Sequence, residues 1–285
     1  CQCIVHECSL AELPFLGVYI PLRNTNFRLA ELERLEHRHA ADILNEHILV
    51  MHFCVKLFET LAQPDLCHGK EGNKAAREFY NDVFLRVLSR STSNFADFQP
   101  SESSATNIFD KIKQISEQLY NEALQYSKRL AFATDVIPYD GPLCDYLNFL
   151  FPILDGLAKL QGFQKDSIYL LIDDAHCLNE TQTRVLNSWV STRTSRRVSL
   201  KISTEYNYKT YYTLAGQKID TPHDFSEIDI TIIYTGSSKS KYSDRVADIV
   251  KKRLAVYGVE GSSPEDFFPE DEEQEAQIRE IEEEY

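Results

Sequence analysis

Ser167-Ile-Tyr-Leu-Leu-Ile-Asp173-Asp174 is the stretch that decides the fold, an apolar run of strand length that ends in two acids. Such a run predicts a buried strand of a parallel sheet. Ligands gather beyond the carboxyl ends of these strands, so Asp173 and Asp174 are expected to face a site. There one acid can hold Mg²⁺, a cation that prefers oxygen ligands, and its neighbour can orient or deprotonate a water. An Asp that merely caps the following helix is the alternative explanation.

The residues that follow this run continue the alternation of helices and strands. A helix is expected over Glu180 to Ser191, and a second apolar run, Val198 to Thr204, ends in the hydroxyls of Ser203 and Thr204. Strands this apolar, separated by helices, indicate a parallel sheet that helices cover on both faces. We therefore predict a three-layer α/β fold. Further strands are predicted over Leu13 to Leu22 and over Ile228 to Thr235.

Most residues between 28 and 160 follow the period of amphipathic helices. Asp140-Gly-Pro142 is expected to supply the N-cap and the early proline of the last of them. The predicted helices run over Arg28 to Ala62, in one or two pieces, Lys74 to Arg90, Thr106 to Leu130, and Leu143 to Leu160. Elsewhere we expect a serine-rich loop over Ser89 to Ser104, a β-hairpin over Tyr208 to Asp220, and a helix over Ser243 to Tyr257.

Charge and composition limit the functions that the chain can have. The formal net charge is −14, and residues 265–284 hold eleven acids against one base. The rest of the chain is mildly acidic, so its overall charge gives no indication of nucleic-acid binding. No apolar run approaches the roughly 20 residues that cross a bilayer, so no membrane association is expected. Seven cysteines scattered through apolar segments indicate a reducing compartment, and we expect a cytoplasmic protein.

The run SIYLLIDDAHCLNETQTRVLNSWVSTRTSRRVSLKIST, the hairpin Gly216-Gln-Lys-Ile-Asp220 and the later Asp224-Phe-Ser-Glu-Ile-Asp-Ile together resemble bacterial AAA+ ATPases related to the origin-recognition-complex initiators. Those proteins are in turn similar to the signal-transducing STAND ATPases. The resemblance implies a P-loop NTPase core over residues 1–257, with a helical insertion over about 28–130 and an acidic tail over 258–285. ATP and Mg²⁺ are the cofactors that it implies.

The same resemblance assigns roles to single residues. Asp173 would bind Mg²⁺, Asp174 would stand where the catalytic Glu usually is, and Ser203 or Thr204 would be the first sensor of the nucleotide. An Asp in place of Glu is one methylene shorter, which favours slow hydrolysis or a nucleotide-held switch.

The glycine-rich phosphate-binding loop of such enzymes does not occur in the sequence. Gly69-Lys70 has no glycine five residues before it, and Gly216-Gln-Lys218 follows the wrong strand. We expect the loop to lie upstream of Cys1, so that this chain is a fragment of a longer protein. Without backbone amides and a lysine to cradle phosphates, the fragment alone is expected to bind nucleotide poorly and to be inactive.

Two other interpretations fit parts of the sequence. Asp173-Asp-Ala-His176 and Ile202-Ser-Thr204 also resemble two motifs of DEAH-type helicases, but those enzymes place the phosphate loop closer to the acidic box. The same fold with a degenerate site would instead be a non-catalytic scaffold.

The sequence also leads to expectations about partners. Besides nucleotide, we expect a DNA or protein partner through regions outside this chain, and homo-oligomerisation. Arg193 and Arg197 complement the dipole of the helix before the second strand, or they act in trans on a neighbouring subunit's nucleotide.

Overall fold

A computed structural model of the chain describes residues 14–23, 30–35, 38–63, 66, 69–91, 103–160, 167–192, 195–205, 208–230, 239–258 and 276–277. The chain divides into two compact units, Cys1–Ser226 and Glu227–Tyr285, and each unit is described by itself. We predicted a core that extends to residue 257, and that boundary stays a prediction.

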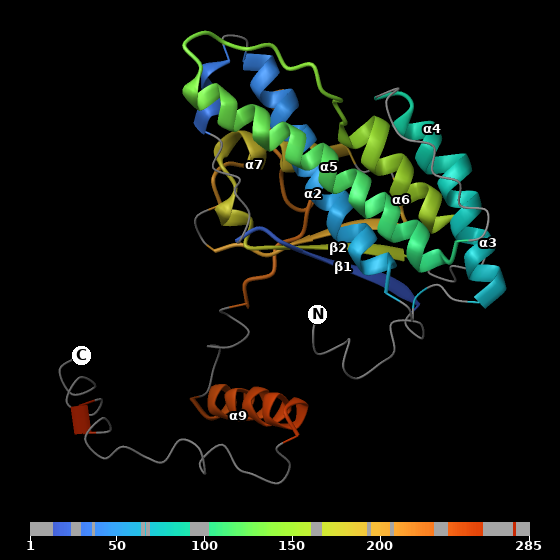
Figure 1. Cartoon of the computed structure of the whole chain (residues 1–285). Coiled ribbons are helices and arrows are strands. Elements are labelled where there is room, and N and C mark those ends of the chain that lie inside the picture. The colour runs from blue at the N-terminus through green and yellow to red at the C-terminus, as the bar shows by residue number, and fades with distance from the viewer. Residues whose placement is uncertain are drawn as a thin grey trace. The chain divides into compact units, whose positions relative to one another are not determined.

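The first unit is built on a parallel sheet of three strands, as the apolar runs predicted (Figure 1). The strands are β1 (Phe15–Pro21), β2 (Ser167–Asp173) and β3 (Val198–Ile202), and β2 lies between the other two. In the register of the sheet, Pro21 lies opposite Asp173, and Ile172 lies opposite Ile202. The carboxyl ends of all three strands therefore meet at one edge, which is where a site was expected.

A bundle of helices covers one face of this sheet. The 3-10 helix η1 (Ala30–Arg34) is followed by α2 (Arg38–Leu61), which packs on β1, on α7 and on α5. Every residue from Ile48 to Cys54 of α2 except His52 is at most 1% exposed, because neighbours surround this helix. The next helical segments are α3 (Gly69–Phe79), the π-helical turn η2 (Tyr80–Phe84), α4 (Leu85–Leu88) and α5 (Ala105–Phe132).

Helix α5 shows why its bounds could be predicted to within two residues. Ser104 caps its first turn, accepting a 3.2 Å hydrogen bond from the backbone amide of Asn107. Buried side chains then recur every three or four residues, from Ile108 and Ile112 to Leu130. The predicted serine-rich loop before it lies mostly outside the described residues.

The next helix begins later than we predicted. Asp145, and not Asp140, caps it, accepting a 2.7 Å hydrogen bond from the amide of Asn148. The amide of Cys144 is instead bound by His47 of α2, which holds the preceding segment in a non-helical conformation. The helix then consists of the π-helical turn η3 (Tyr146–Leu150) and α6 (Phe151–Ala158), with a proline in the first turn of α6.

The crossover from β2 to β3 is short and well anchored. It contains the 3-10 turn η4 (Ala175–Cys177) and α7 (Glu180–Thr192), which packs on α2. The predicted hairpin after β3 is a tight turn with a single antiparallel bridge between Tyr212 and Lys218. Asn187 of α7 holds this turn, since its side-chain amide donates to the carbonyls of Thr210 and Tyr212.

The predicted third layer is not seen among the described residues, so it stays a prediction. On the sheet face away from α2, the side chains of Phe15 and Tyr169 meet edge to face with ring centroids 5.3 Å apart, and Lys201 lies over the ring of Tyr169. These positions are half-buried or exposed, whereas Leu16, Val18 and Ile20 on the helix-covered face are buried.

The second unit is described mainly through α9 (Lys239–Val256), which matches the helix predicted over Ser243 to Tyr257. The predicted strand Ile228 to Thr235 and the acidic tail lie mostly outside the described residues. Among the helices that the structure does describe, none combines the length and the apolar character needed to cross a membrane.

Candidate functional site

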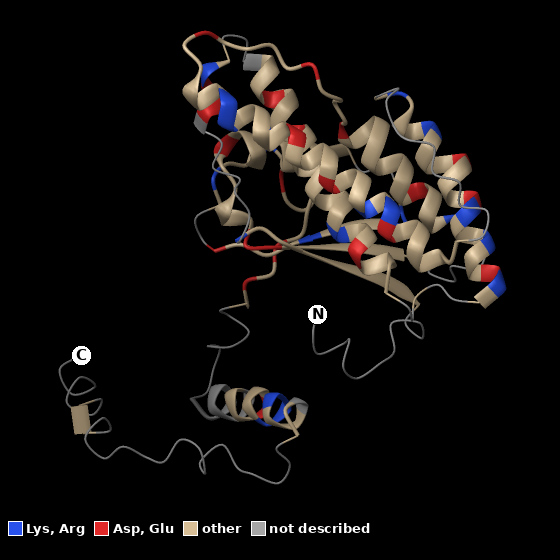
Figure 2. Ribbon diagram, viewed as in Figure 1, with Lys and Arg blue, Asp and Glu red and all other residues tan. Residues whose placement is uncertain are grey.

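Asp173 lies at the end of β2, and its carboxylate is bound by residues of all three strand ends. Oδ2 accepts a 2.8 Å hydrogen bond from the hydroxyl of Tyr19, and Oδ1 accepts one from the hydroxyl of Ser203. Oδ1 also accepts a 3.1 Å hydrogen bond from the amide of Asp174. The side chain thus points away from the core and towards the edge of the sheet, as expected. Figure 2 shows acidic residues in red at this end of the sheet.

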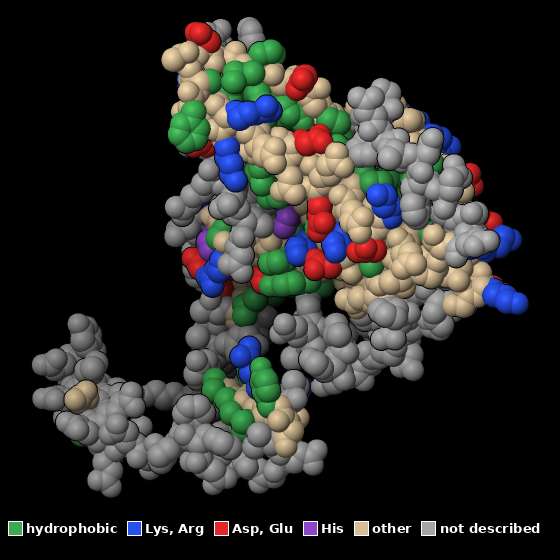
Figure 3. Space-filling model, in the orientation of Figure 1, with side chains coloured by type: hydrophobic (Ala, Val, Ile, Leu, Met, Phe, Trp, Pro, Cys, Tyr) green, Lys and Arg blue, Asp and Glu red, His purple; other side chains and the backbone are tan. Residues whose placement is uncertain are grey.

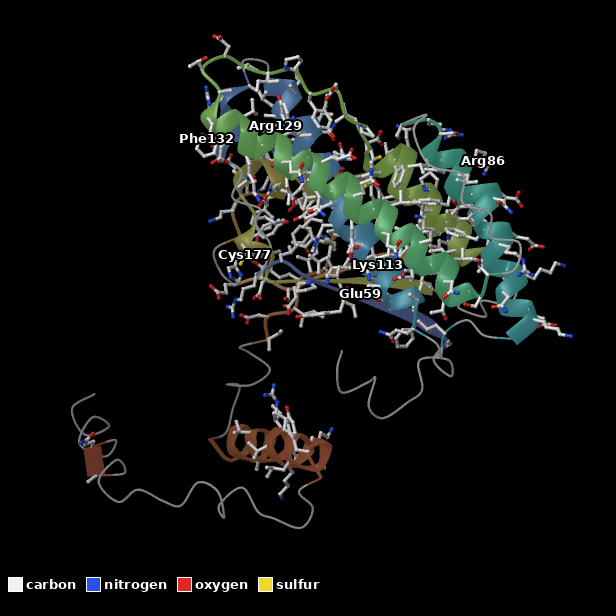
Figure 4. All side chains as sticks on the ribbon, in the orientation of Figure 1. Glu59, Arg86, Lys113, Arg129, Phe132 and Cys177 are labelled. Carbon is white, nitrogen blue, oxygen red and sulfur yellow. The ribbon has the colours of Figure 1, made fainter. Side chains whose placement is uncertain are left out.

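Asp174 directs the chain out of the sheet. Its backbone is left-handed, with φ of 59° and ψ of 43°, a conformation that Asp tolerates better than most residues. Its side chain makes no capping hydrogen bond to η4, so the helix-cap explanation does not account for it. Instead Oδ2 lies 3.5 Å from Nε of Arg23, which follows β1. Cys177, labelled in Figure 4, ends the 3-10 turn that begins here.

Of the two predicted hydroxyls, Ser203 meets Asp173 and Thr204 does not. The backbone hydrogen bonds between β2 and β3 continue past the end of β3. The amide of Ser203 donates to the carbonyl of Ile172 at 2.8 Å, and the amide of Ala175 donates to the carbonyl of Ser203 at 3.0 Å. This pairing holds the Ser203 hydroxyl beside the acid. Thr204 is exposed, and its hydroxyl donates to the backbone carbonyl of Glu205.

Hydrogen bonding determines the acidity of the carboxylate. The hydrogen bond from Ser203 is the main cause of a lowered pKa at Asp173. The hydrogen bonds from Tyr19 and from the Asp174 amide and the charge of Arg23 also lower this pKa, whereas partial desolvation raises it. The hydrogen bond to Asp173 in turn raises the pKa of Tyr19. Asp173 is therefore ionised at neutral pH, which is the state that a cation requires.

Tyr19 and Arg23 were missed by the reasoning from sequence. Both belong to β1 or its end, and neither stands in a recognisable motif. They reach the acids only because the parallel register sets Tyr19 opposite Leu171, two residues before Asp173 and on the same side of the sheet. The sequence shows that a tyrosine lies within the predicted strand Leu13 to Leu22. It does not show the register of the sheet, which places this tyrosine beside Asp173.

Of the two arginines proposed to act in trans, the structure describes only Arg197. Arg193 lies outside the described residues. Arg197 precedes β3 at the opposite end from Ser203, and its guanidinium donates a 2.6 Å hydrogen bond to the carbonyl of Ala158 at the end of α6. That contact resembles the stabilisation of a helix C-terminus by a basic side chain. A role at a neighbouring subunit's nucleotide stays a prediction for both residues.

In the view of Figure 3, the described residues place basic and acidic side chains close to one another over the helices. Near the labelled Glu59 and Lys113 of Figure 4, Lys56 lies 2.7 Å from Glu59, and Lys113 lies 3.5 Å from Asp110 and 3.9 Å from Glu117. These pairs are half-buried at their lysines, exposed at their acids and local to their helices, so they contribute little. The strand-end cluster is the stronger candidate for a functional site.

The acid at the end of β2 and the hydroxyl that follows β3 lie together at the carboxyl edge of the parallel sheet. P-loop ATPases use an Asp of this kind to hold Mg²⁺. The comparison with known families agrees with this class. The family model described as ORC-CDC6-like matches residues 4–285, and the chain belongs to that family. It is therefore an AAA+ ATPase-like protein related to ORC and CDC6, as the sequence predicted. No curated protein and no solved structure gives a significant match.

Proposed function

We propose that the protein binds ATP with Mg²⁺ at the strand-end cluster and hydrolyses it slowly, so that the bound nucleotide acts as a switch. The observation that carries the proposal is the hydrogen-bonded carboxylate of Asp173, which is joined to Ser203 at the carboxyl edge of the sheet. Membership of the ORC-CDC6-like family supports it, because AAA+ ATPases are nucleotide-binding proteins.

The residues present fit a magnesium ion. The low pKa of Asp173 supplies an anionic oxygen, and the hydroxyl of Ser203 adds a neutral oxygen within the same cluster. Mg²⁺ takes one or two carboxylates and keeps several waters in nucleotide sites, so one acid suffices from this side. When bound, Mg²⁺ would neutralise charge on the phosphate oxygens.

Asp174 is the residue that we propose to orient the attacking water. Its carboxylate is one methylene shorter than the usual Glu, and Arg23 lies 3.5 Å from it. A water-orienting acid must be within hydrogen-bond reach of the water, so a shorter side chain held by a cation favours slow turnover. Slow turnover suits a switch that keeps its nucleotide.

The test is Mg²⁺-dependent ATP hydrolysis by the full-length protein. Asp173→Asn is expected to lower the rate by at least about 100-fold, since it removes the metal-binding charge. Asp155→Asn, which changes a carboxylate on α6 that pairs with Lys159, is the matched control and should leave the rate unchanged. A rate that survives Asp173→Asn would rule out this function.

The scaffold alternative and the partners are tested in the same protein. If neither wild type nor Asp173→Asn binds or hydrolyses ATP, the fold acts as a non-catalytic interaction module. For the partners, we propose contact with DNA or with another protein, and ATP-dependent self-association in which Arg193 or Arg197 faces a neighbour's nucleotide. Light scattering with and without ATP measures that association directly.

A further inference from the structure

The carboxylate of Asp173 has almost all of its acceptor capacity occupied. A carboxylate offers about four lone-pair sites, two on each oxygen. Ser203 and the Asp174 amide both donate to Oδ1, and Tyr19 donates to Oδ2. Among the described residues no donor takes the fourth site, which belongs to Oδ2, the atom held by Tyr19.

Tyr19 is well placed to fix the direction of that remaining site. Its backbone is pinned in the parallel ladder opposite Leu171, and the ring rises from the sheet on the same side as Asp173. The hydroxyl reaches Oδ2 at 2.8 Å, although 154 residues separate the two side chains in the sequence. Ser203 alone holds only one oxygen, whereas donors on both oxygens prevent rotation of the carboxyl group.

We propose that Tyr19 is a positioning residue that orients the Asp173 carboxylate towards Mg²⁺. This inference rests on the proposed function, because it assumes that Asp173 holds the metal. Donors to a ligating carboxylate fix its orientation, and their loss typically costs 10 to 100-fold in metal affinity. Tyr19 therefore contributes to metal affinity without touching the metal or the nucleotide.

A metal-binding measurement separates this role from a structural one. Mn²⁺, which electron paramagnetic resonance detects, is titrated into the full-length protein with ATP. Tyr19→Phe keeps the ring and removes the hydroxyl, so the dissociation constant for Mn²⁺ is expected to rise about 10-fold. The matched control is Tyr169→Phe, which removes a hydroxyl from the neighbouring strand, on the same face of the sheet, where the ring packs on Phe15. It should bind Mn²⁺ like wild type.

Asp173→Asn distinguishes the failure of this inference from the failure of the proposed function. If Asp173→Asn binds Mn²⁺ normally, Asp173 is not the metal ligand and the proposed function fails. If Asp173→Asn loses Mn²⁺ while Tyr19→Phe retains wild-type affinity, the metal site stands and the role of Tyr19 is overturned.

A second measurement retains the hydroxyl in case Tyr19→Phe does not fold. 3-Fluorotyrosine at position 19 keeps both the ring and the donor, and its ¹⁹F resonance reports the surroundings of the hydroxyl. The resonance is expected to shift during a Mg²⁺ titration with ATP, and to stay fixed in Asp173→Asn. A resonance that ignores Mg²⁺ in the otherwise unchanged protein would contradict the proposal.

Discussion

Nε1 of Trp189 lies 3.1 Å from Oε1 of Glu46, so the only tryptophan of the chain donates a hydrogen bond to a half-buried carboxylate. The same oxygen accepts a 3.1 Å hydrogen bond from the amide of Tyr146. Three segments, α2, α7 and the turn η3, are thereby joined at one atom. Because the ring of Trp189 also stacks on Tyr146 and meets Phe53 edge to face, its fluorescence reports the integrity of this core.

Replacing Glu46 by Leu is expected to destabilise the protein by at least about 2 kcal/mol, because two donors lose their acceptor at a cost of about 1–3 kcal/mol each. Glu46→Gln keeps an acceptor oxygen and should be tolerated far better. Urea unfolding followed by Trp189 emission measures both. Glu59→Gln, on the exposed side of the same helix, is the control and should stay within about 0.5 kcal/mol of wild type.

Burial raises the pKa of Glu46, and this shift adds a dependence on pH. An acid with a raised pKa in the folded state contributes stability that is complete below its unfolded pKa and is lost as the pH rises through the folded one. Glu46→Gln should therefore gain stability relative to wild type as the pH rises through that window. If the difference between the two proteins does not vary with pH, the carboxyl group is not desolvated as described.

Two buried histidines give the opposite dependence. Burial lowers the pKa of His47 and of His52 from 6.5 to about 4. The unfolded chain binds protons at a higher pH than the folded one, so stability is present above about pH 6.5 and falls as the pH drops towards 4. Each imidazole contributes up to about 1.4 kcal/mol per pH unit.

Chemical unfolding at several pH values between about 7 and about 4 measures how the free energy of unfolding changes with pH. His47→Gln offers a neutral acceptor for the Cys144 amide and should remove about half of the histidine contribution. His223→Gln, at an exposed position, should leave the slope unchanged. Equal slopes in all three proteins would mean that folding does not lower the pKa of His47.

The two hydroxyls at the end of β3 are expected to differ in their effect on ATP turnover. Ser203→Ala removes the donor to Oδ1 of Asp173 and should lower the rate about 10 to 100-fold, the usual cost of losing a donor to a metal ligand. Thr204→Val removes a bond to the carbonyl of Glu205 only, so it should change the rate less than about twofold. A larger loss in Thr204→Val than in Ser203→Ala would reverse the assignment.

The apolar patterns of the sequence predicted the helices and strands whose bounds depend on their own residues. The strand Ser167–Asp173 ended where predicted, and α7 ended within one residue of its expected bound, because a buried apolar run and a regular apolar stripe depend on neighbouring residues. The start of the helix at Tyr146 could not be predicted in this way. His47 and Glu46 bind the amides of Cys144 and Tyr146 across 97 and 100 residues of sequence, and no local rule contains those partners.

The candidate site divides in the same manner. Asp173 and Ser203 follow from the rule that parallel strands end at a common edge, which requires only that both segments be strands. Tyr19 and Arg23 require the strand order and the register of β1, both of which the whole sheet sets. The choice between Ser203 and Thr204 was open for a related reason, since the end of β3 at Ile202 decides which hydroxyl turns towards Asp173.

A last prediction concerns the packing of α6 against the π-helical turn η2. A Cβ placed on Gly156 would lie 2.8 Å from Cγ1 and 3.1 Å from Cγ2 of Val83, so the glycine permits a close approach of the two helices. Gly156→Ala gains about 0.5–1 kcal/mol of helix propensity, but overpacking typically costs about 1–3 kcal/mol, and the stiff valine cannot rotate away. We expect a net loss of stability in urea unfolding followed by Trp189 emission.

Adding Val83→Ala makes room for the new methyl group, so the double variant should lose less stability than the two single losses added together. Strict additivity would show that the two side chains do not meet.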